Sequence, residues 1–452
     1  MSNLKWLHER FEQNAHKQFI IWNGTPYLYK DLSAEIAQWS EKLKANNVVA
    51  GNTVSIEGDY SPNTVALLLA LIELDTIIIP LTSSIEMHKD EFREIAQVQV
   101  CINVSEDDSS TITHTKRSIE NPLLKQLVEQ GHPGLVLFSS GSTGKSKAAL
   151  HDFSPLLEKF KKPRHTFVSL TFLLLDHIGG INTLLYILSN TGTIVTVPER
   201  NPDTVLRVIE KEKVELLPTS PTFLNLILIS EAYTRYDLSC LKRVTYGTEV
   251  MPQSTLDKLC EILPNVEFQQ TYGLSELGIL RSKSREPKSL WVKVGGEGFE
   301  TKVENGVLLI KAQSAMLGYL NAPSPFDAEG WFNTDDAVEV DGEWIKILGR
   351  QSEMINVGGL KVYPVEVENV LLGMPNVKDV AVMSEKNPIT GQIVVATFNL
   401  FESEDLPSLR KRVREYCKDR LASYKVPAKI VIVDNDQYSQ RFKKMRRATQ
   451  NV

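Results

Sequence analysis

Residues 138–151 hold the side chains in this chain that are best suited to chemistry. An apolar run is followed by hydroxyls, glycines and two lysines within one loop. Glycine lets backbone N–H groups approach oxyanions closely, hydroxyls donate further hydrogen bonds, and lysine adds positive charge. The segment therefore predicts a cradle for a triphosphate. Its candidate phosphate-binding residues are Ser139, Ser140, Gly141, Ser142, Thr143, Gly144, Lys145 and Lys147.

Three interpretations fit this loop taken alone. The P-loop pattern G-x-x-x-x-G-K-[ST] is met at its end but has Ser139 in place of its first glycine. The segment also resembles the loop of the AMP-forming adenylating enzymes, where an aromatic residue precedes Ser/Thr-Ser-Gly-Ser/Thr-Thr-Gly, then Pro-Lys-Gly and a later His. Here Ser146 replaces the usual Pro and Ala148 the usual Gly. The third interpretation is a Ser/Gly-rich surface loop that binds nothing.

A second segment, 271–276, resembles the Tyr-Gly-x-Thr-Glu motif of the same family. The resemblance implies that Tyr272 stacks on adenine and that Ser275 binds the α-phosphate. It also implies that Glu276 helps to hold the Mg²⁺ that bridges ATP oxygens, and that Gly273 borders the substrate site. Ser275 and Glu276 are thus candidate catalytic residues. A Tyr-Gly turn beside a solvated Glu is the structural alternative.

Residues 246–249 are similar to the family's Gly-Gly/Ala-Glu segment beside the adenine, which makes Gly247, Thr248 and Glu249 candidate adenine contacts. A plain turn explains this segment nearly as well.

The block at 330–336, followed by Gly342 and by Gly349-Arg350, resembles the family's Gly-Trp-x-x-Thr-Gly-Asp…Gly-Arg at matching spacing. The resemblance implies that Asp336 accepts hydrogen bonds from both ribose hydroxyls and that Arg350 reaches the ribose or a phosphate. Asp335 stands where the family usually has Gly. An Asp–Arg pair across a hairpin is the structural alternative.

Three further positions are similar to parts of the family's C-terminal region. Ser352 matches the hinge, where many members carry Asp, and Gly358 and Gly359 match the segment that lines the tunnel for the thiol acceptor. Lys443, within the basic stretch 441–447, aligns with the catalytic lysine, although Phe442 replaces the Gly that usually precedes it. Its role would be to stabilise the pentavalent transition state. For Gly358 and Gly359 the alternative is a plain Gly-Gly turn. For Lys443 the alternatives are that Lys444 is the catalytic lysine or that the stretch is a solvated basic tail.

His177 lies in an Asp-His-Ile-Gly-Gly segment that resembles the family's motif at the mouth of the acyl pocket. The resemblance implies that His177 contacts the carboxyl region of the substrate, and a core histidine is the alternative. An aryl acid or a short to medium acyl acid is expected.

The elements that must position these residues alternate between short β-rich runs and helical patterns, which predicts βαβ units and a mainly parallel sheet. The phosphate segment is expected as strand, loop and helix, with the strand at 135–138 and the helix at 154–160. Past residue 295 the pattern becomes antiparallel, with hairpins at Asn305-Gly306 and Asp341-Gly342. A mixed unit follows.

The predicted fold class is therefore α/β, with a large N-terminal domain of mainly parallel sheets with flanking helices plus a β-rich subdomain, and a small mobile α+β C-terminal domain. The expected divisions are 1–349 for the adenylation core, 350–353 for the hinge and 354–452 for the mobile domain.

Composition limits the partners of the chain. Its 452 residues carry a formal net charge of −6, with 42% hydrophobic and 23% charged residues, so no global attraction to nucleic acid or anionic membrane is expected. The four cysteines form no C-x-x-C pair, which favours a reducing cytoplasm. Neither a signal peptide nor a membrane span is predicted. A monomer or homodimer is expected.

Together the motifs predict a ligase that uses ATP and Mg²⁺ to activate a small carboxylic acid as an acyl adenylate, releasing pyrophosphate. The acyl group then passes to a thiol, either CoA or the phosphopantetheine of an acyl carrier protein. Two alternatives stay open. One is an acyl-adenylate enzyme with a non-thiol acceptor, and the other is a degenerate nucleotide-binding homologue without catalysis.

Overall fold

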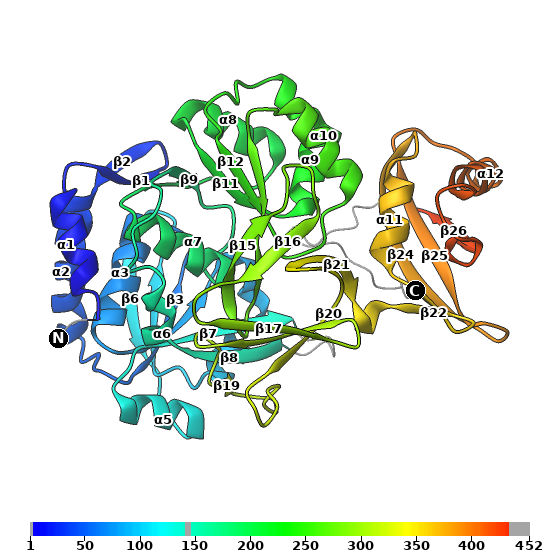
Figure 1. Cartoon of the computed structure of the whole chain (residues 1–452). Coiled ribbons are helices and arrows are strands. Elements are labelled where there is room, and N and C mark those ends of the chain that lie inside the picture. The colour runs from blue at the N-terminus through cyan, green and yellow to red at the C-terminus, as the bar shows by residue number, and fades with distance from the viewer. Residues whose placement is uncertain (1–2, 141–145, 434–452) are drawn as a thin grey trace.

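A computed structural model of the chain describes residues 3–140 and 146–433. Three seven-stranded sheets form the larger part of the molecule, and a five-stranded sheet forms a separate C-terminal unit at the right of Figure 1. The four cysteines are free thiols. Within the described residues, the helices are all too short or too polar to cross a membrane.

The first sheet has the order β13-β12-β11-β9-β10-β1-β2. All its neighbours pair in parallel except the N-terminal hairpin β1–β2. The strands are β1 (Gln18–Trp22), β2 (Thr25–Leu28), β9 (Val168–Leu170), β10 (Thr193–Val195), β11 (Leu216–Thr219), β12 (Arg243–Tyr246) and β13 (Glu267–Gln270).

The second sheet has the order β19-β8-β7-β4-β3-β5-β6, with a parallel centre of β7, β4, β3 and β5 and antiparallel edges. Its strands are β3 (Thr53–Glu57), β4 (Ile77–Leu81), β5 (Val100–Val104), β6 (Ser110–His114), β7 (Gly134–Ser140), β8 (Ser146–Asp152) and β19 (Gly318–Tyr319).

Helices cover these two sheets, and two of them lie between the sheets. The helix α3 is apolar on all sides, and together with α7 it shares one hydrophobic core with side chains from both sheets, which explains its burial. The helices are α1 (Lys5–Gln13), α2 (Tyr29–Ala45), α3 (Pro62–Glu73), α4 (Lys89–Ile95), α5 (Pro122–Gln130), α6 (Phe153–Glu158), α7 (Ile178–Ser189), α8 (Pro202–Glu212), α9 (Pro221–Ser230) and α10 (Gln253–Ile262), with the 3₁₀ helices η1 (Ser83–His88) and η2 (Ala232–Thr234).

The third sheet is antiparallel, in the order β14-β15-β16-β21-β20-β18-β17. Asn305 and Gly306 both have left-handed φ angles, of 52° and 78°, as a tight hairpin requires. The other predicted turn is shifted by one residue, because Asp341 pairs with Trp344 and Gly342 begins the turn. The strands are β14 (Tyr272–Leu274), β15 (Gly278–Ser284), β16 (Trp291–Gly295), β17 (Phe299–Glu304), β18 (Val307–Ala312), β20 (Phe332–Asp341) and β21 (Trp344–Arg350).

The C-terminal unit has a hydrophobic core of its own, built from residues between Ile355 and Ile430. This separate core supports a domain division near the predicted hinge. The elements are η3 (Gln351–Glu353), β22 (Ile355–Val357), β23 (Leu360–Val362), α11 (Pro364–Leu372), β24 (Val377–Asn387), β25 (Gly391–Leu400), α12 (Leu406–Cys417), η4 (Ser423–Lys425) and β26 (Lys429–Ile432).

The predicted strand, loop and helix around the phosphate segment were wrong in one respect. A second strand, β8, returns antiparallel to β7 before α6 begins at Phe153. The segment is therefore a β-hairpin, and the helix that a P-loop needs directly after its loop is replaced by a strand. This topology speaks against the P-loop interpretation.

Candidate active site

Strands β7 and β8 form a hairpin, here called the phosphate hairpin, that brings the two ends of the predicted loop together. Ser139 pairs with Lys147 and Ser140 with Ser146 across β7 and β8, so the register brackets the loop at 141–145. The predicted loop residues Gly141, Ser142, Thr143, Gly144 and Lys145 lie outside the described residues. The flanks alone thus place one hydroxyl residue and one lysine opposite each other at the mouth of the loop.

A tyrosine, Tyr319, connects Glu276 with this hairpin. The hydroxyl of Tyr319 donates to Glu276 Oε1 at 2.6 Å, and Lys147 Nζ lies 5.2 Å from the centroid of the same tyrosine ring. The predicted metal carboxylate and a predicted phosphate lysine therefore share one neighbour. Sequence reasoning missed Tyr319, because it lies in a strand of two residues, β19, outside the motifs described above.

Ser275 is held to the same hairpin through a buried histidine. Burial lowers the pKa of His151 from its ordinary value of 6.5 to about 4, so the ring is neutral. Since a carbonyl only accepts, the neutral ring donates its Nε2–H to the backbone oxygen of Ser275, at 2.6 Å. The segment that carries Ser275 and Glu276 is thus tied to β8 through the Ser275 carbonyl and to β19 through the Glu276 side chain.

A polar triad with two buried members, Tyr272 and Asp336, lies at the other end of that segment. Tyr272 donates from its hydroxyl to Asp336 Oδ2 at 2.5 Å, and Arg350 Nε lies 3.1 Å from Asp336 Oδ1. Arg350 stands opposite Asp336 in the register of β20 and β21. Burial raises the pKa of Asp336, while the Arg350 charge and the Tyr272 hydroxyl oppose that rise. The predicted ribose residues and the predicted adenine residue are therefore in direct contact.

In the candidate adenine segment, the backbone at Gly247 lies close to Thr271. A Cβ on Gly247 would lie 2.6 Å from Thr271 Oγ1 and 2.8 Å from its carbonyl oxygen, so this position requires glycine. Thr248 has a left-handed φ of 72°. Glu249 accepts from the backbone N–H of Thr222 at 2.8 Å and so caps the start of α9. The structure thus gives Glu249 a role in holding α9, in addition to its predicted place beside the adenine.

Gly273 also fills a position that admits no side chain. It pairs with Ile279 in the β14–β15 hairpin, where a Cβ would lie 2.4 Å from Ile279 Cδ1 and 2.8 Å from the carbonyl oxygen of Gly278. Glycine at this position therefore lets β14 and β15 lie close together.

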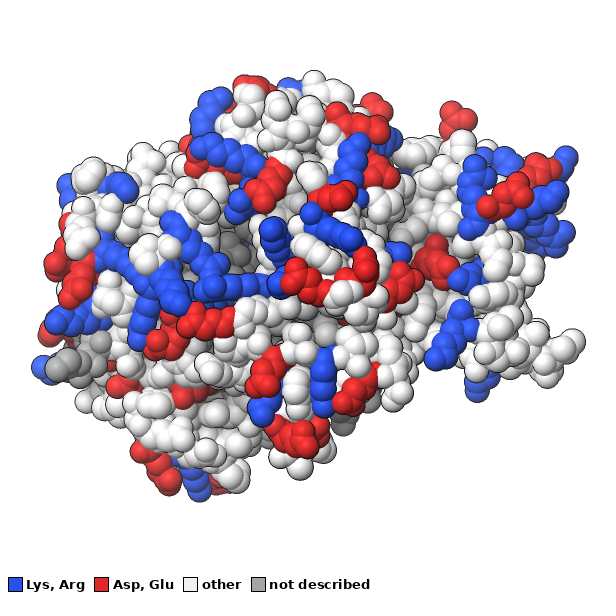
Figure 2. Space-filling view, viewed as in Figure 1, with Lys and Arg blue, Asp and Glu red and all other residues white. Residues whose placement is uncertain are grey.

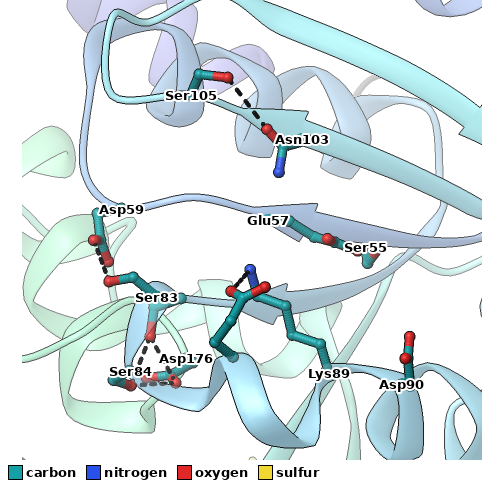
Figure 3. A network of polar contacts seen from close by, with 12 residues as sticks. Ser55, Glu57, Asp59, Ser83, Ser84, Lys89, Asp90, Asn103, Ser105 and Asp176 are labelled. Atoms are coloured by element: carbon teal, nitrogen blue, oxygen red, sulfur yellow. Dashed lines mark hydrogen bonds and ion pairs between the residues drawn. The ribbon is translucent and has the colours of Figure 1, made fainter.

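His177 begins α7 at the carboxyl edge of the second sheet. Its Nδ1 accepts from the N–H of Gly179 at 3.1 Å, so the ring caps the helix. The neighbouring Asp176 accepts from Thr82 and Ser84, which follow β4, at 2.9 and 3.4 Å (Figure 3). Because β4 runs parallel to and beside β7, the same sheet edge carries the phosphate hairpin and the His177 segment. The predicted acid site and the predicted phosphate site therefore lie at the same edge of the sheet.

The same edge carries a second hydroxyl–carboxylate pair. Ser83 donates to Asp59 Oδ2 at 2.7 Å, and Figure 3 shows the two side chains pointing toward each other above Ser84 and Asp176. These polar contacts fix the loops that follow β3 and β4.

The predicted hinge residue contacts strand β20, which carries Asp335 and Asp336. Ser352 donates from its hydroxyl and from its backbone N–H to the carboxylate of Asp335. Asp335 has a left-handed φ of 63°, as suits a position where the family usually has glycine. The predicted hinge residue thus lies against a position at which this chain departs from the family pattern.

The predicted thiol-tunnel glycines form an open turn. Gly358 and Gly359 join β22 to β23 with left-handed φ angles of 60° and 90°, and a Cβ on either would meet no atom within 4 Å. The predicted catalytic lysine, Lys443, and its rival Lys444 lie outside the described residues.

Basic side chains are unevenly distributed despite the negative net charge. Figure 2 shows Lys and Arg gathered in a band across the larger part of the molecule and again over the outer end of the C-terminal unit, where α12 lies. Such local surfaces attract anionic ligands without a basic chain overall.

The donor set at Glu276 fits magnesium bound together with a triphosphate. Within the described ranges, no group of three His, Cys, Asp or Glu side chains could hold a metal ion. Magnesium commonly binds through one or two carboxylates together with substrate phosphates and water. Glu276 beside the phosphate hairpin supplies that kind of partial shell.

Comparison with known proteins yields matches along most of the chain. Residues 7–320 match the model of the AMP-binding enzymes, and residues 366–443 match that of the AMP-binding enzyme C-terminal domain. The indoleacetate–CoA ligase of Aromatoleum aromaticum is 26% identical over 95% of this chain and 94% of its own length. The 2-succinylbenzoate–CoA ligase of Listeria monocytogenes is 22% identical over 95% of each chain.

A solved structure of an anthranilate–CoA ligase in complex with anthranoyl-AMP has the same fold. It aligns with a TM-score of 0.84 at 19% identity, over 98% of this chain and 95% of the other. This likeness confirms the predicted α/β architecture with a smaller C-terminal unit.

Proposed function

The chain belongs to the AMP-binding enzyme family, and from that premise we propose that it activates a carboxylic acid with ATP and transfers the acyl group to CoA. One observation carries the proposal. The segment 272–276 contacts Asp336 through Tyr272 at one end and the phosphate hairpin, through Glu276 and Tyr319, at the other. A single short segment thus spans the predicted ribose and phosphate sites.

The first half-reaction overcomes the low reactivity of a carboxylate, which is a poor electrophile with a poor leaving group. A carboxylate oxygen forms a bond to the α-phosphorus of ATP, the bond from that phosphorus to the bridging oxygen breaks, and pyrophosphate leaves. Lys147 and the loop flanks would stabilise the departing charge, and Lys443 would stabilise the pentavalent transition state. Magnesium bound at Glu276 would neutralise phosphate charge.

In the second half-reaction the thiol sulfur attacks the acyl carbonyl, the carbon–oxygen bond to AMP breaks, and AMP leaves. One lysine cannot conveniently serve both steps, so the C-terminal unit would turn about residues 350–353 between them. The separate hydrophobic core of that unit supports this division. Gly358 and Gly359 would then line the path of the pantetheine arm, since their turn is open.

An aromatic acid is the proposed substrate class. The acids named for the two relatives, indoleacetate and 2-succinylbenzoate, both carry an aromatic ring. His177 at the start of α7 would contact the carboxyl region, and apolar residues of α7 follow it. CoA is the proposed acceptor, because both relatives are named as CoA ligases.

The decisive experiment is ATP–pyrophosphate exchange over a panel of aryl, arylalkyl, short-chain and medium-chain acids. Exchange with aromatic acids and formation of AMP are the expected results. Absence of exchange with every acid, despite measurable ATP binding, would favour the degenerate homologue, for which Phe442, Ala148 and Asp335 are the departures from the family pattern.

The acceptor needs its own assay once an active acid is known. Free CoA, a phosphopantetheinylated carrier protein and a simple amine are supplied side by side with the acyl adenylate. Faster AMP release with CoA supports the proposal. A rate that rises only with the carrier protein or the amine would contradict the choice of acceptor while leaving the adenylation step intact.

A further inference from the structure

The short strand β19 and the residues after it belong to none of the motifs described above, yet they touch both the phosphate hairpin and Glu276. Gly318 and Tyr319 pair with Leu150 and Ala149 of β8, so the strand forms the edge of the second sheet. Tyr319 is almost fully buried, with 7% of its surface exposed. A buried tyrosine with its hydroxyl on a carboxylate calls for an explanation.

We propose that Tyr319 is a positioning residue for divalent-cation binding at Glu276, and that its ring holds Lys147 apart from that carboxylate. This inference deepens the proposed function and rests on it. The hydroxyl sets the direction of the Glu276 carboxylate, and the ring face sets the place of the lysine.

The hydroxyl contact suits a metal ligand. Tyr319 donates to Glu276 Oε1 at 2.6 Å and carries no charge, so it orients the carboxylate without cancelling its negative charge. Among the residues that the structure describes, Oε2 has no hydrogen-bond partner, so Oε2 and the second lone pair of Oε1 can bind a cation. Hydrogen bonds from outer residues to metal-binding carboxylates typically govern metal affinity by ten- to a hundredfold.

The ring contact keeps two opposite charges apart. Within the described part of the chain, neither Lys147 nor Glu276 takes part in an ion pair, although both contact Tyr319. A direct pair would neutralise the lysine that a phosphate needs and the carboxylate that a cation needs. The lysine instead lies over the ring face, where the attraction leaves its charge available.

The backbone around Tyr319 fixes its place relative to the hairpin. The side chain of Asn321 accepts from the N–H of Ala148 at 3.0 Å and donates to the carbonyl of Ser146 at 2.9 Å. On the other side, the N–H of Met316 donates to the backbone oxygen of Glu276 at 2.8 Å. The stretch 316–321 thus connects the start of β8, directly after the phosphate loop, with the segment that carries Glu276.

The test measures binding directly, with Mn²⁺ as the probe cation and α,β-methylene-ATP as an unreactive nucleotide. Electron paramagnetic resonance reports Mn²⁺ bound in the ternary complex, and calorimetry in EDTA reports nucleotide binding without metal. We expect Tyr319→Phe to weaken Mn²⁺ binding about tenfold. Nucleotide affinity in EDTA should stay within twofold, because the ring under Lys147 remains.

Two further variants separate the hydroxyl from the ring. Tyr319→Leu removes both, so it should weaken nucleotide binding in EDTA severalfold in addition to the loss of Mn²⁺ affinity. Tyr29→Phe is the matched control, since it removes a buried hydroxyl that donates to the carbonyl of Gly192. This control should lower stability and leave both affinities unchanged.

The outcomes separate this inference from the function on which it rests. If Tyr319→Phe binds Mn²⁺ like the unmodified protein while Glu276→Gln loses it, the positioning role is overturned and the proposed function stands. A Tyr319→Phe protein with weakened nucleotide binding in EDTA would also overturn it, in favour of a general structural role. Unchanged Mn²⁺ binding in Glu276→Gln would overturn the metal assignment itself.

Discussion

The backbone N–H of Ser352 donates to Asp335 Oδ1 at 3.2 Å, and the Ser352 hydroxyl donates to the other oxygen of the same carboxylate. The contact joins the predicted hinge to the strand that carries Asp336. It would restrain a hinge at Ser352, because the carboxylate accepts two donors from one residue. Asp335 stands where the family usually has Gly, and we call its contact with Ser352 the hinge latch.

Ser352→Ala removes the hydroxyl from this latch and leaves the backbone donor. We expect pyrophosphate exchange and thioester formation from supplied acyl adenylate to change in opposite directions, by up to about tenfold for the loss of one charge-assisted hydrogen bond. Each half-reaction is measured separately. Ser352→Thr retains a hydroxyl and should behave like the unmodified protein. A change of both rates in the same direction would argue against a conformational role.

Tyr272 has two roles that substitutions can separate. Tyr272→Phe removes the donor to the buried Asp336, so we expect the free energy of unfolding to fall by about 2 kcal/mol. ATP affinity should stay within threefold, because an aromatic ring remains for adenine. Tyr272→Leu should weaken ATP binding by a further tenfold. Equal ATP affinities for the two variants, measured by calorimetry, would remove the stacking role.

Asp336 should distinguish ATP from 2′-deoxy-ATP. If its carboxylate accepts from the ribose hydroxyls, the unmodified protein will bind ATP at least tenfold more tightly than the deoxynucleotide. Asp336→Ala should weaken ATP binding and abolish that preference. A preference that persists in the variant would remove Asp336 from the ribose site.

Lys443→Ala should lower pyrophosphate exchange about 10²- to 10³-fold, as expected for loss of a donor that stabilises transition-state charge. Thioester formation from supplied acyl adenylate should stay within twofold. Lys444→Ala is the adjacent control and should retain both activities. Loss of both half-reactions in Lys443→Ala would end its specific assignment to adenylation, and loss of exchange in Lys444→Ala alone would transfer the role to that lysine.

His151 should make stability depend on pH. Burial lowers its pKa from 6.5 to about 4, so between these values the unfolded chain binds a proton that the folded chain excludes. The free energy of unfolding therefore falls as the pH decreases, by about 2 kcal/mol between pH 7.5 and pH 5 from this residue. Above the unfolded pKa of 6.5 neither state binds this proton, so His151 causes no loss of stability there.

Denaturant unfolding at several pH values tests this prediction. His151→Gln keeps an N–H donor for the Ser275 carbonyl and should reduce the loss between pH 7.5 and 5. His114→Gln is the control, because His114 also contacts a backbone carbonyl but is exposed. An identical pH dependence in His151→Gln and the unmodified protein would contradict a buried neutral histidine.

The sequence predicted those elements whose signals are local. The alternation of β-rich runs and helical patterns is such a signal, and β12, β13 and the helix α8 (Pro202–Glu212) belong to the α/β architecture that it predicted. The helix begins with Asn201 accepting from the N–H of Thr204 and with a proline at its first turn, which are strong local start signals. The central parallel strands were predicted from apolar runs, which are also local signals.

The strand β8 had no such signal. Its residues Ser146–Asp152 include Lys147 and two alanines and lack β-branched side chains, so strand propensity is weak. Pairing with β7 on one side and β19 on the other decides its conformation. A partner 170 residues away in the chain cannot be read from a local window.

The site was predictable as motifs and unpredictable as contacts. Asp335 was recognised as a departure from the family and Ser352 as the hinge position, but the hydrogen bonds between them depend on the pairing of Asp336 with Arg350. Tyr319 and Asn321 gave no signal, because their importance comes from a chain crossing rather than from their neighbours in the sequence. Motifs specify which chemistry is present, and tertiary register specifies what holds it.

The late arrival of β19 has a consequence during synthesis on the ribosome. Strand β8 is complete at Asp152, but its outer edge stays open until Gly318 and Tyr319 have emerged, after the whole first sheet and five of the seven strands of the third. An unpaired edge strand is a template for association with other chains. A nascent chain stalled between these points would expose that edge, so a chaperone that covers β8 would act during this interval.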